Sequence, residues 1–163
     1  GVQTCALPIF IATRASGRTG PDFVSYVGLP EELLKLTADA DVVVNTVPLT
    51  PQTQDLFDAA FFARMKPTAY FINVARGGSV VTDALVAALK NRRIAGAGLD
   101  VTDPEPLPPD HPLWSAPNVI ITPHVANDSD LGSEVELALS KENLRRYIAG
   151  ERMLSVVDVA RGY

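Results

Sequence analysis

The feature that most constrains the fold is a series of short apolar runs that recur along the chain with helical segments between them. The runs are predicted strands, and they occupy residues 10–13, 23–27, 41–45, 70–74, 97–101 and 119–121. The run Asp41-Val42-Val43-Val44-Asn45 lacks polar alternation, so both of its faces are predicted to be buried. The strand at 70–74 is likewise predicted to be a buried strand. The pattern favours an α/β fold with a doubly wound parallel sheet.

Helical patterns with recognisable ends separate these runs. The first predicted helix begins at Pro30, where Glu31 and Glu32 suit a first turn. Three further helices are predicted at residues 58–64, 82 to about 91, and 129 to about 149. Thr82 is predicted to cap the third helix, with Leu85, Val86 and Leu89 facing inward. The fourth is expected to be amphipathic and to end at Gly150, and residues 156–157 are predicted to form a final short strand.

Composition excludes several classes of partner. The 163 residues are 47% hydrophobic and 20% charged, with a net charge of −5, so there is no basic footprint for nucleic acid. No apolar run approaches the roughly 18–20 residues of a membrane span. We therefore expect a cytoplasmic protein without nucleic-acid or membrane partners, and its single cysteine, Cys5, allows no internal disulfide.

The first nine residues need separate treatment. They read Gly-Val-Gln-Thr-Cys-Ala-Leu-Pro-Ile and resemble the translation of a short-read sequencing adapter. We interpret residues 1–9 as a non-native segment and exclude them from fold reasoning. The alternative is a genuine, irregular N-terminus.

The polar candidates fall where predicted strands end. Arg76 follows the strand at 70–74, Asp100 lies at the end of the strand at 97–101, His124 follows 119–121, and Pro48 follows 41–45. The carboxyl ends of parallel strands meet at one edge of a sheet, and ligands of such folds bind there. The sequence therefore predicts a site at this edge.

Three of these side chains suit proton and hydride chemistry on a small acid. Arg76 could clamp a carboxylate, and the Gly77-Gly78 pair behind it could let a ligand approach the backbone. His124 could transfer a proton near neutral pH, and Glu105 beside it could hold its charge. Each residue alone has a structural alternative: a turn arginine, a solvated loop acid and a strand-end histidine. His111, before Pro112, is interpreted as structural, in a capped turn anchored by a tryptophan.

The motifs that carry these residues resemble a known family. The segments are Val-Pro-Leu-Thr at 47–50, Asn-Val-Ala-Arg-Gly-Gly at 73–78, Gly-Leu-Asp-Val at 98–101, Asp-Pro-Glu-Pro-Leu at 103–107, His-Pro-Leu-Trp at 111–114 and Thr-Pro-His-Val-Ala at 122–126. Together they are similar to the D-isomer-specific 2-hydroxyacid dehydrogenases, from about Ile11 onward. The resemblance implies an incomplete Rossmann-type sheet that lacks its first strand and phosphate-binding loop. It also implies a partial dinucleotide-binding domain at 10–126, and at 127–163 a C-terminal helix and return toward a missing substrate domain.

The resemblance also implies roles. Arg76 would bind the substrate carboxylate and polarise its keto group, His124 would donate the proton in reduction, and Glu105 would hydrogen-bond His124. No metal site is implied, and the complete protein is expected to be a homodimer. The cofactor-binding positions would be Arg14, Val47, Pro48, Thr53, Val74, Ala75 and Asp100.

The cofactor is NADP or NAD. The segment after the first predicted strand contains Arg14 and Arg18 and no acid, which favours NADP. The alternative is that both arginines are solvated loop charges.

The expected activity is reduction of a small 2-keto acid, such as glyoxylate or hydroxypyruvate, or oxidation of the 2-hydroxy acid. One alternative is a dinucleotide-sensing regulatory protein on the same fold. Another is a formate dehydrogenase, against which Glu105 argues, because those relatives typically carry glutamine there.

Overall fold

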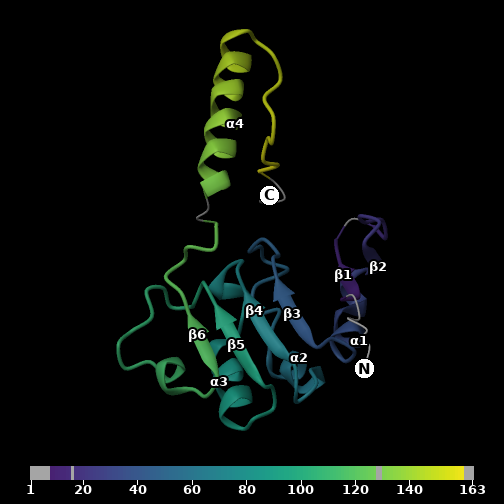
Figure 1. The fold of residues 1–163 in the computed structure, drawn as a ribbon, viewed down its shortest axis with the longest axis vertical. Helices are drawn as coiled ribbons and strands as arrows, with labels where there is room; N and C mark the ends of the chain where they lie inside the picture. The colour runs from purple at the N-terminus through teal and green to yellow at the C-terminus, as the bar shows by residue number, and fades with distance from the viewer. Residues whose placement is uncertain (1–7, 16, 128–129, 160–163) are drawn as a thin grey trace, which may run out of the picture.

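The chain folds around parallel strands that form two partial sheets (Figure 1). The computed structural model describes residues 8–15, 17–127 and 130–159. In the smaller sheet, β1 (Phe10–Thr13) pairs with β2 (Val24–Gly28). In the larger, neighbouring strands follow chain order: β3 (Val42–Asn45), β4 (Tyr70–Asn73), β5 (Gly96–Leu99) and β6 (Val119–Ile121). The predicted parallel α/β class is confirmed, and the two partial sheets fit its incomplete, Rossmann-type form.

Short helices and 3₁₀ turns connect the strands, and one longer helix follows the last strand. The chain forms a 3₁₀ turn η1 (Pro30–Glu32), then α1 (Leu33–Thr37), α2 (Ala59–Arg64), η2 (Gly77–Ser79), α3 (Thr82–Lys90), η3 (Pro112–Ser115) and α4 (Asp130–Ile148). Asp58 caps α2 by accepting a hydrogen bond from the Phe61 amide at 2.8 Å. The predicted cap of α3 is wrong, because Val81 occupies that position. Thr82 instead donates its hydroxyl to the Asp103 carbonyl at 2.8 Å.

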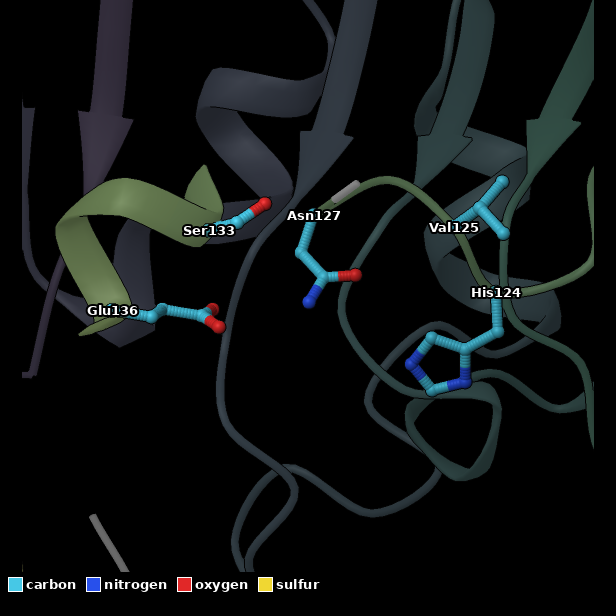
Figure 2. A pocket seen from close by; sticks show the side chains of 5 residues that line it. All are labelled: His124, Val125, Asn127, Ser133 and Glu136. Atoms are coloured by element: carbon cyan, nitrogen blue, oxygen red, sulfur yellow. The ribbon is translucent and has the colours of Figure 1, made fainter. Parts of the chain in front are cut away.

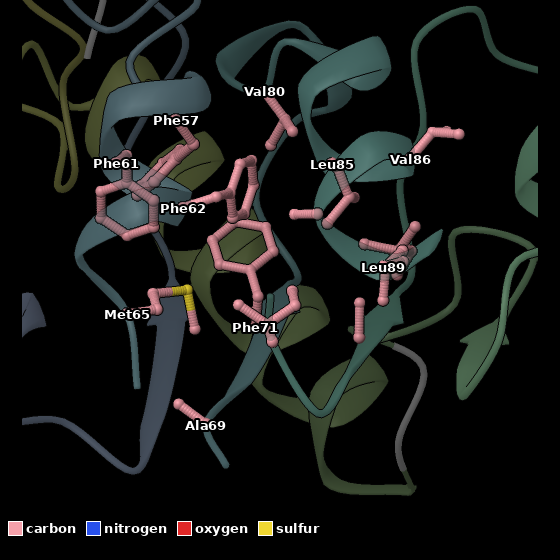
Figure 3. Packing of buried hydrophobic residues seen from close by; sticks show 14 of the residues in the cluster. Phe57, Phe61, Phe62, Met65, Ala69, Phe71, Val80, Leu85, Val86 and Leu89 are labelled. Carbon is pink, nitrogen blue, oxygen red and sulfur yellow. The ribbon is translucent and has the colours of Figure 1, made fainter. Parts of the chain in front are cut away.

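The hydrophobic core lies between the larger sheet and the helices α2 and α3 (Figure 3). Its centre is four phenylalanines whose ring centroids lie 4.8–6.0 Å apart: Phe57, Phe61, Phe62 and Phe71. Leu85, Val86 and Leu89 are buried, so the predicted inward face of α3 is confirmed. Each such side chain contributes roughly 1.5–3 kcal/mol on burial. This packing holds β4 and β5, and the loops that follow them, in place.

The opposite face of the larger sheet is exposed. The strand register places Val44, Ile72, Gly98 and Ile120 in one row across it. Val42 and Val44 are 54% and 55% exposed, and Ile120 is 71% exposed. The prediction that the strands at 41–45 and 70–74 are buried on both faces is therefore wrong in this chain. Among the described residues, the helices that pack on β4 and β5 cover one face only.

The C-terminal helix α4 extends away from the sheet, and the chain then runs back beside it (Figure 1). Gly150, at φ 69°, ends the helix as predicted. The Gly150 amide donates to the Tyr147 carbonyl at 3.2 Å and the Glu151 amide to the Arg146 carbonyl at 2.8 Å, a Schellman arrangement. The strand predicted at 156–157 is not formed. No helix in the described part of the chain is both long and apolar enough to cross a membrane.

Candidate active site

His124 and Glu105 form a direct pair beyond the carboxyl ends of the strands. The His124 Nδ1 lies 2.7 Å from the Glu105 Oε1, and the two side chains are 43% and 41% exposed. The hydrogen bond with His124 is the main reason that the pKa of the Glu105 carboxyl is lowered. Glu105 is thus held in its charged form beside the imidazole, while the second ring nitrogen faces a cavity (Figure 2).

Asp100 fixes the backbone of the segment that carries His124. One carboxylate oxygen accepts the Thr122 hydroxyl at 2.6 Å and the Val125 amide at 2.9 Å, and the other accepts the Ala126 amide at 2.8 Å. The Thr122 hydrogen bond leads the causes that lower the Asp100 pKa. His124 has φ 58°, a left-handed conformation that costs on the order of 1–3 kcal/mol in a non-glycine residue. Asp100 therefore positions His124, and its expected contact with the nicotinamide stays a prediction.

A buried amide network that we did not predict from the sequence fixes the turns after β3 and β4. Asn45 donates its side-chain amide to Asn73 at 2.9 Å and to the Ser79 hydroxyl at 2.8 Å. The side-chain oxygen of Asn45 accepts the Val47 amide, and that of Asn73 accepts the Ala75 amide, both at 3.1 Å. The available signal was an asparagine at the end of each of two apolar strands.

Arg76 projects from the turn that this network holds. Its carbonyl accepts hydrogen bonds from the Ser79 hydroxyl at 2.7 Å and the Asn73 amide at 3.1 Å. Its exposed guanidinium donates to the Ala75 carbonyl at 2.6 Å. A guanidinium carries five N–H donors, so this one hydrogen bond leaves donors for a ligand carboxylate.

Gly77, in the turn after Arg76, packs directly against the backbone of the segment that leads to Glu105. A Cβ at Gly77 would lie 2.0 Å from the Thr102 carbonyl oxygen, which no side chain can tolerate. We expected the Gly77-Gly78 pair to admit a ligand, and for Gly77 that explanation is wrong. The close neighbour is the chain's own backbone, three residues before Glu105.

The other expected cofactor positions lie in the turns after β3 and β4. Thr53 donates its hydroxyl to the Pro48 carbonyl at 2.6 Å and accepts the Thr50 amide at 2.8 Å, which closes the turn at 48–53. Val74 is 40% exposed at the end of β4. These contacts define the backbone shape, and cofactor binding by these residues stays a prediction.

The two arginines after β1 differ in their contacts. Arg14 donates to the Thr19 carbonyl at 2.7 Å. Arg18 lies 2.7 Å from the Glu32 carboxylate and 2.9 Å from the Tyr26 hydroxyl. The Tyr26 hydrogen bond is the largest cause that lowers the Glu32 pKa to about 2. Arg18 is therefore an ion-paired residue, not a solvated loop charge.

His111 has the structural role that was predicted, in a turn that Leu113 anchors together with the predicted Trp114. Its Nδ1 accepts the Leu113 amide at 3.2 Å and so caps η3. The Trp114 indole donates to the Pro108 carbonyl at 2.8 Å, and the neighbouring Leu113 is 2% exposed, so both side chains anchor this turn.

A cavity of about 230 Å³ lies next to His124 (Figure 2). It is lined by His124, Val125, Asn127, Ser133 and Glu136, the last two from α4. Its polar lining beside the His124–Glu105 pair could hold a small polar molecule within reach of the imidazole. Within the described residues, no three His, Cys, Asp or Glu side chains are grouped to hold a metal ion.

Comparison with known proteins gives consistent results. An uncharacterized protein encoded in the proB 3′ region of Corynebacterium melassecola is 49% identical over 126 residues, covering 77% of this chain and 41% of the relative. A D-isomer-specific 2-hydroxyacid dehydrogenase from Xanthobacter autotrophicus Py2, solved with NADPH and MES, is 40% identical with a TM-score of 0.85; the match covers 94% of this chain and 62% of that one. An NADPH-dependent glyoxylate/hydroxypyruvate reductase from Sinorhizobium meliloti, solved with NADP and sulfate, is 32% identical with a TM-score of 0.83, over 94% and 49% of the two chains.

The chain thus spans less than two thirds of the length of each of these relatives. The family model for the NAD-binding domain of D-isomer-specific 2-hydroxyacid dehydrogenases matches residues 10–126, which include every residue of the site described above except Asn127, Ser133 and Glu136. On this evidence the chain belongs to the D-isomer-specific 2-hydroxyacid dehydrogenase family.

Proposed function

We propose that the complete protein reduces small 2-keto acids, with glyoxylate and hydroxypyruvate as substrates, and prefers NADPH. The observation that carries the proposal is the His124–Glu105 pair, with its 2.7 Å contact, beside a cavity at the carboxyl edge of the sheet. A histidine paired with a carboxylate can deliver a proton near neutral pH. The glyoxylate/hydroxypyruvate reductase of Sinorhizobium meliloti, similar in fold, supports the choice of substrates.

In this mechanism the residues of the chain bind the substrate and supply the proton. Arg76 binds the carboxylate and draws electron density from the adjacent keto group. His124 passes its proton to the keto oxygen as C2 is reduced, and the Glu105 carboxylate stabilises the imidazolium beforehand. When bound, the nicotinamide supplies the hydride, so one keto acid, one NADPH and one proton give one hydroxy acid and NADP⁺.

The turns at the carboxyl edge fit a dinucleotide. The buried network of Asn45, Asn73 and Ser79 fixes the backbone amides of Val47 and Ala75. We propose that these turns hold the cofactor through Val47, Pro48, Thr53, Val74, Ala75 and Asp100. Arg14, directly after β1, would bind the 2′-phosphate of NADPH. We further propose that the complete protein forms a homodimer.

The test is a steady-state assay of the complete gene product with glyoxylate and hydroxypyruvate and with each cofactor. We expect a higher kcat/KM with NADPH than with NADH. Arg14→Asp should raise the KM for NADPH at least about tenfold, because a charge-assisted phosphate contact is lost. Lys90→Asp is the matched control, since it makes the same charge change on an exposed residue at the end of α3.

Two outcomes would contradict the proposal. An equal or higher kcat/KM with NADH in the parent protein would overturn the cofactor preference. NADPH binding without turnover of either keto acid would overturn the enzyme assignment and favour the dinucleotide-sensing alternative.

A further inference from the structure

The cavity next to His124 has an acidic wall on α4. Glu136 and the His124 ring point toward one another across this space, and the Asn127 amide reaches into it (Figure 2). Among the described residues, Val125 is the only apolar side chain in the lining, and no lysine or arginine of that part of the chain lines the cavity. Ser133 and Glu136 lie outside the region matched by the family model. They had no part in the catalytic roles expected from the sequence.

What this wall would meet in a bound substrate follows from the proposed function, on which this inference rests. A keto acid whose carbonyl oxygen meets His124 and whose carboxylate meets Arg76 has one further substituent on C2. The cavity adjoins the imidazole and has about 230 Å³, which is room for a substituent of a few atoms. That substituent would enter the space between His124 and Glu136.

We propose that Glu136 is a specificity-determining residue that selects 2-keto acids by the charge of the group beyond C2. A hydroxyl or ammonium group there donates a hydrogen bond to the Glu136 carboxylate. A second carboxylate meets a like charge, and no cation among the described lining residues compensates for it. The site therefore favours substrates such as hydroxypyruvate and rejects dicarboxylic keto acids such as oxaloacetate.

The test compares three substrates in the complete gene product with NADPH: glyoxylate, hydroxypyruvate and oxaloacetate. Glu136→Gln keeps the shape of the side chain and removes its charge. We expect the kcat/KM for oxaloacetate, relative to glyoxylate, to rise about tenfold in Glu136→Gln and further in Glu136→Lys. Glyoxylate carries no carbon beyond C2, so it is the reference substrate against which the oxaloacetate value of each variant is compared. Glu134→Gln is the matched control, because Glu134 is exposed on the same helix and does not line the cavity.

The outcomes separate this inference from the proposed function. If the parent enzyme reduces glyoxylate and both Glu136 variants leave the oxaloacetate-to-glyoxylate ratio of kcat/KM unchanged, selection by Glu136 is overturned and the proposed function stands. A parent without keto acid reduction would overturn the proposed function. In that case calorimetric titration of the NADP⁺-bound protein with hydroxypyruvate and oxaloacetate decides the inference. Weaker oxaloacetate binding that Glu136→Gln relieves would support it, and equal binding of both acids would overturn it.

Discussion

The Glu105–His124 pair should set the pH range of the reaction, and Glu105→Gln tests this. Glutamine can still accept a hydrogen bond from the His124 Nδ1 across the 2.7 Å contact, so the change removes the charge and keeps the geometry. The Glu105 pKa is lowered mainly by its hydrogen bond with His124. The Glu105 carboxylate therefore places a negative charge 2.7 Å from the ring that would donate the proton.

The size of the effect follows from exposure. The side chains of His124 and Glu105 are 43% and 41% exposed, so solvent screens the pair. Ion pairs of this kind contribute about 0.2–1 kcal/mol. At about 1.36 kcal/mol per pH unit, Glu105→Gln should move the alkaline limb of the reduction profile downward by roughly 0.2–0.7 pH unit. The Glu105 pKa is lowered in the folded protein, so the pairing stabilises the fold fully at pH values above the ordinary carboxyl pKa. This stabilisation is lost as the pH falls through the lowered pKa.

The assay is kcat/KM for hydroxypyruvate reduction by the complete gene product, measured from about pH 5 to 9.5. Glu31→Gln, at an exposed acid in η1, is the control for a general change in charge. An alkaline limb that stays in place or moves upward in Glu105→Gln would refute the reasoning.

Three further predictions concern stability and assembly. Gly77→Ala should lower the free energy of unfolding by at least about 2 kcal/mol in urea titrations, because its Cβ meets backbone. Gly78→Ala should cost less, since the nearest atom is a flexible Leu49 methyl at 3.2 Å. Asp100→Asn should lower kcat more than NADPH affinity, and cost about 1–3 kcal/mol of stability, because its amide faces other donors; equal losses in kcat and affinity would contradict this. The 163-residue chain alone should self-associate in size-exclusion chromatography through the exposed face of β3–β6, and a monodisperse monomer would count against this.

Local patterns predicted most of the strands and helices. A β-branched apolar run indicated β3, an apolar run with two aromatic residues indicated β4, and the helix predicted at 58–64 corresponds to α2. The position of the site also followed from topology, since parallel strands bring their carboxyl ends to one edge. Thr82 was assigned the wrong role because a hydroxyl near a helix start can also bond a distant carbonyl, here that of Asp103.

The remaining features depend on tertiary contacts. The Asn45–Asn73 hydrogen bond joins residues 28 positions apart, and although each asparagine ends an apolar strand, no local pattern shows that the two side chains meet. The need for glycine at position 77 arises from the Thr102 backbone across the site. The exposure of Val42 and Val44 depends on which elements cover the sheet, which the composition of a strand does not specify.

The most direct test of the central proposal follows the hydride. The complete gene product would be incubated with hydroxypyruvate and NADPH deuterated at the transferring C4 position, and the product analysed by mass spectrometry and chiral chromatography. Deuterium should appear at C2 of D-glycerate in the parent protein and should be lost in His124→Asn, with NADPH binding retained. Tight NADPH binding by the parent with no deuterium in any product would contradict the assignment of His124, Glu105 and Arg76 to catalysis.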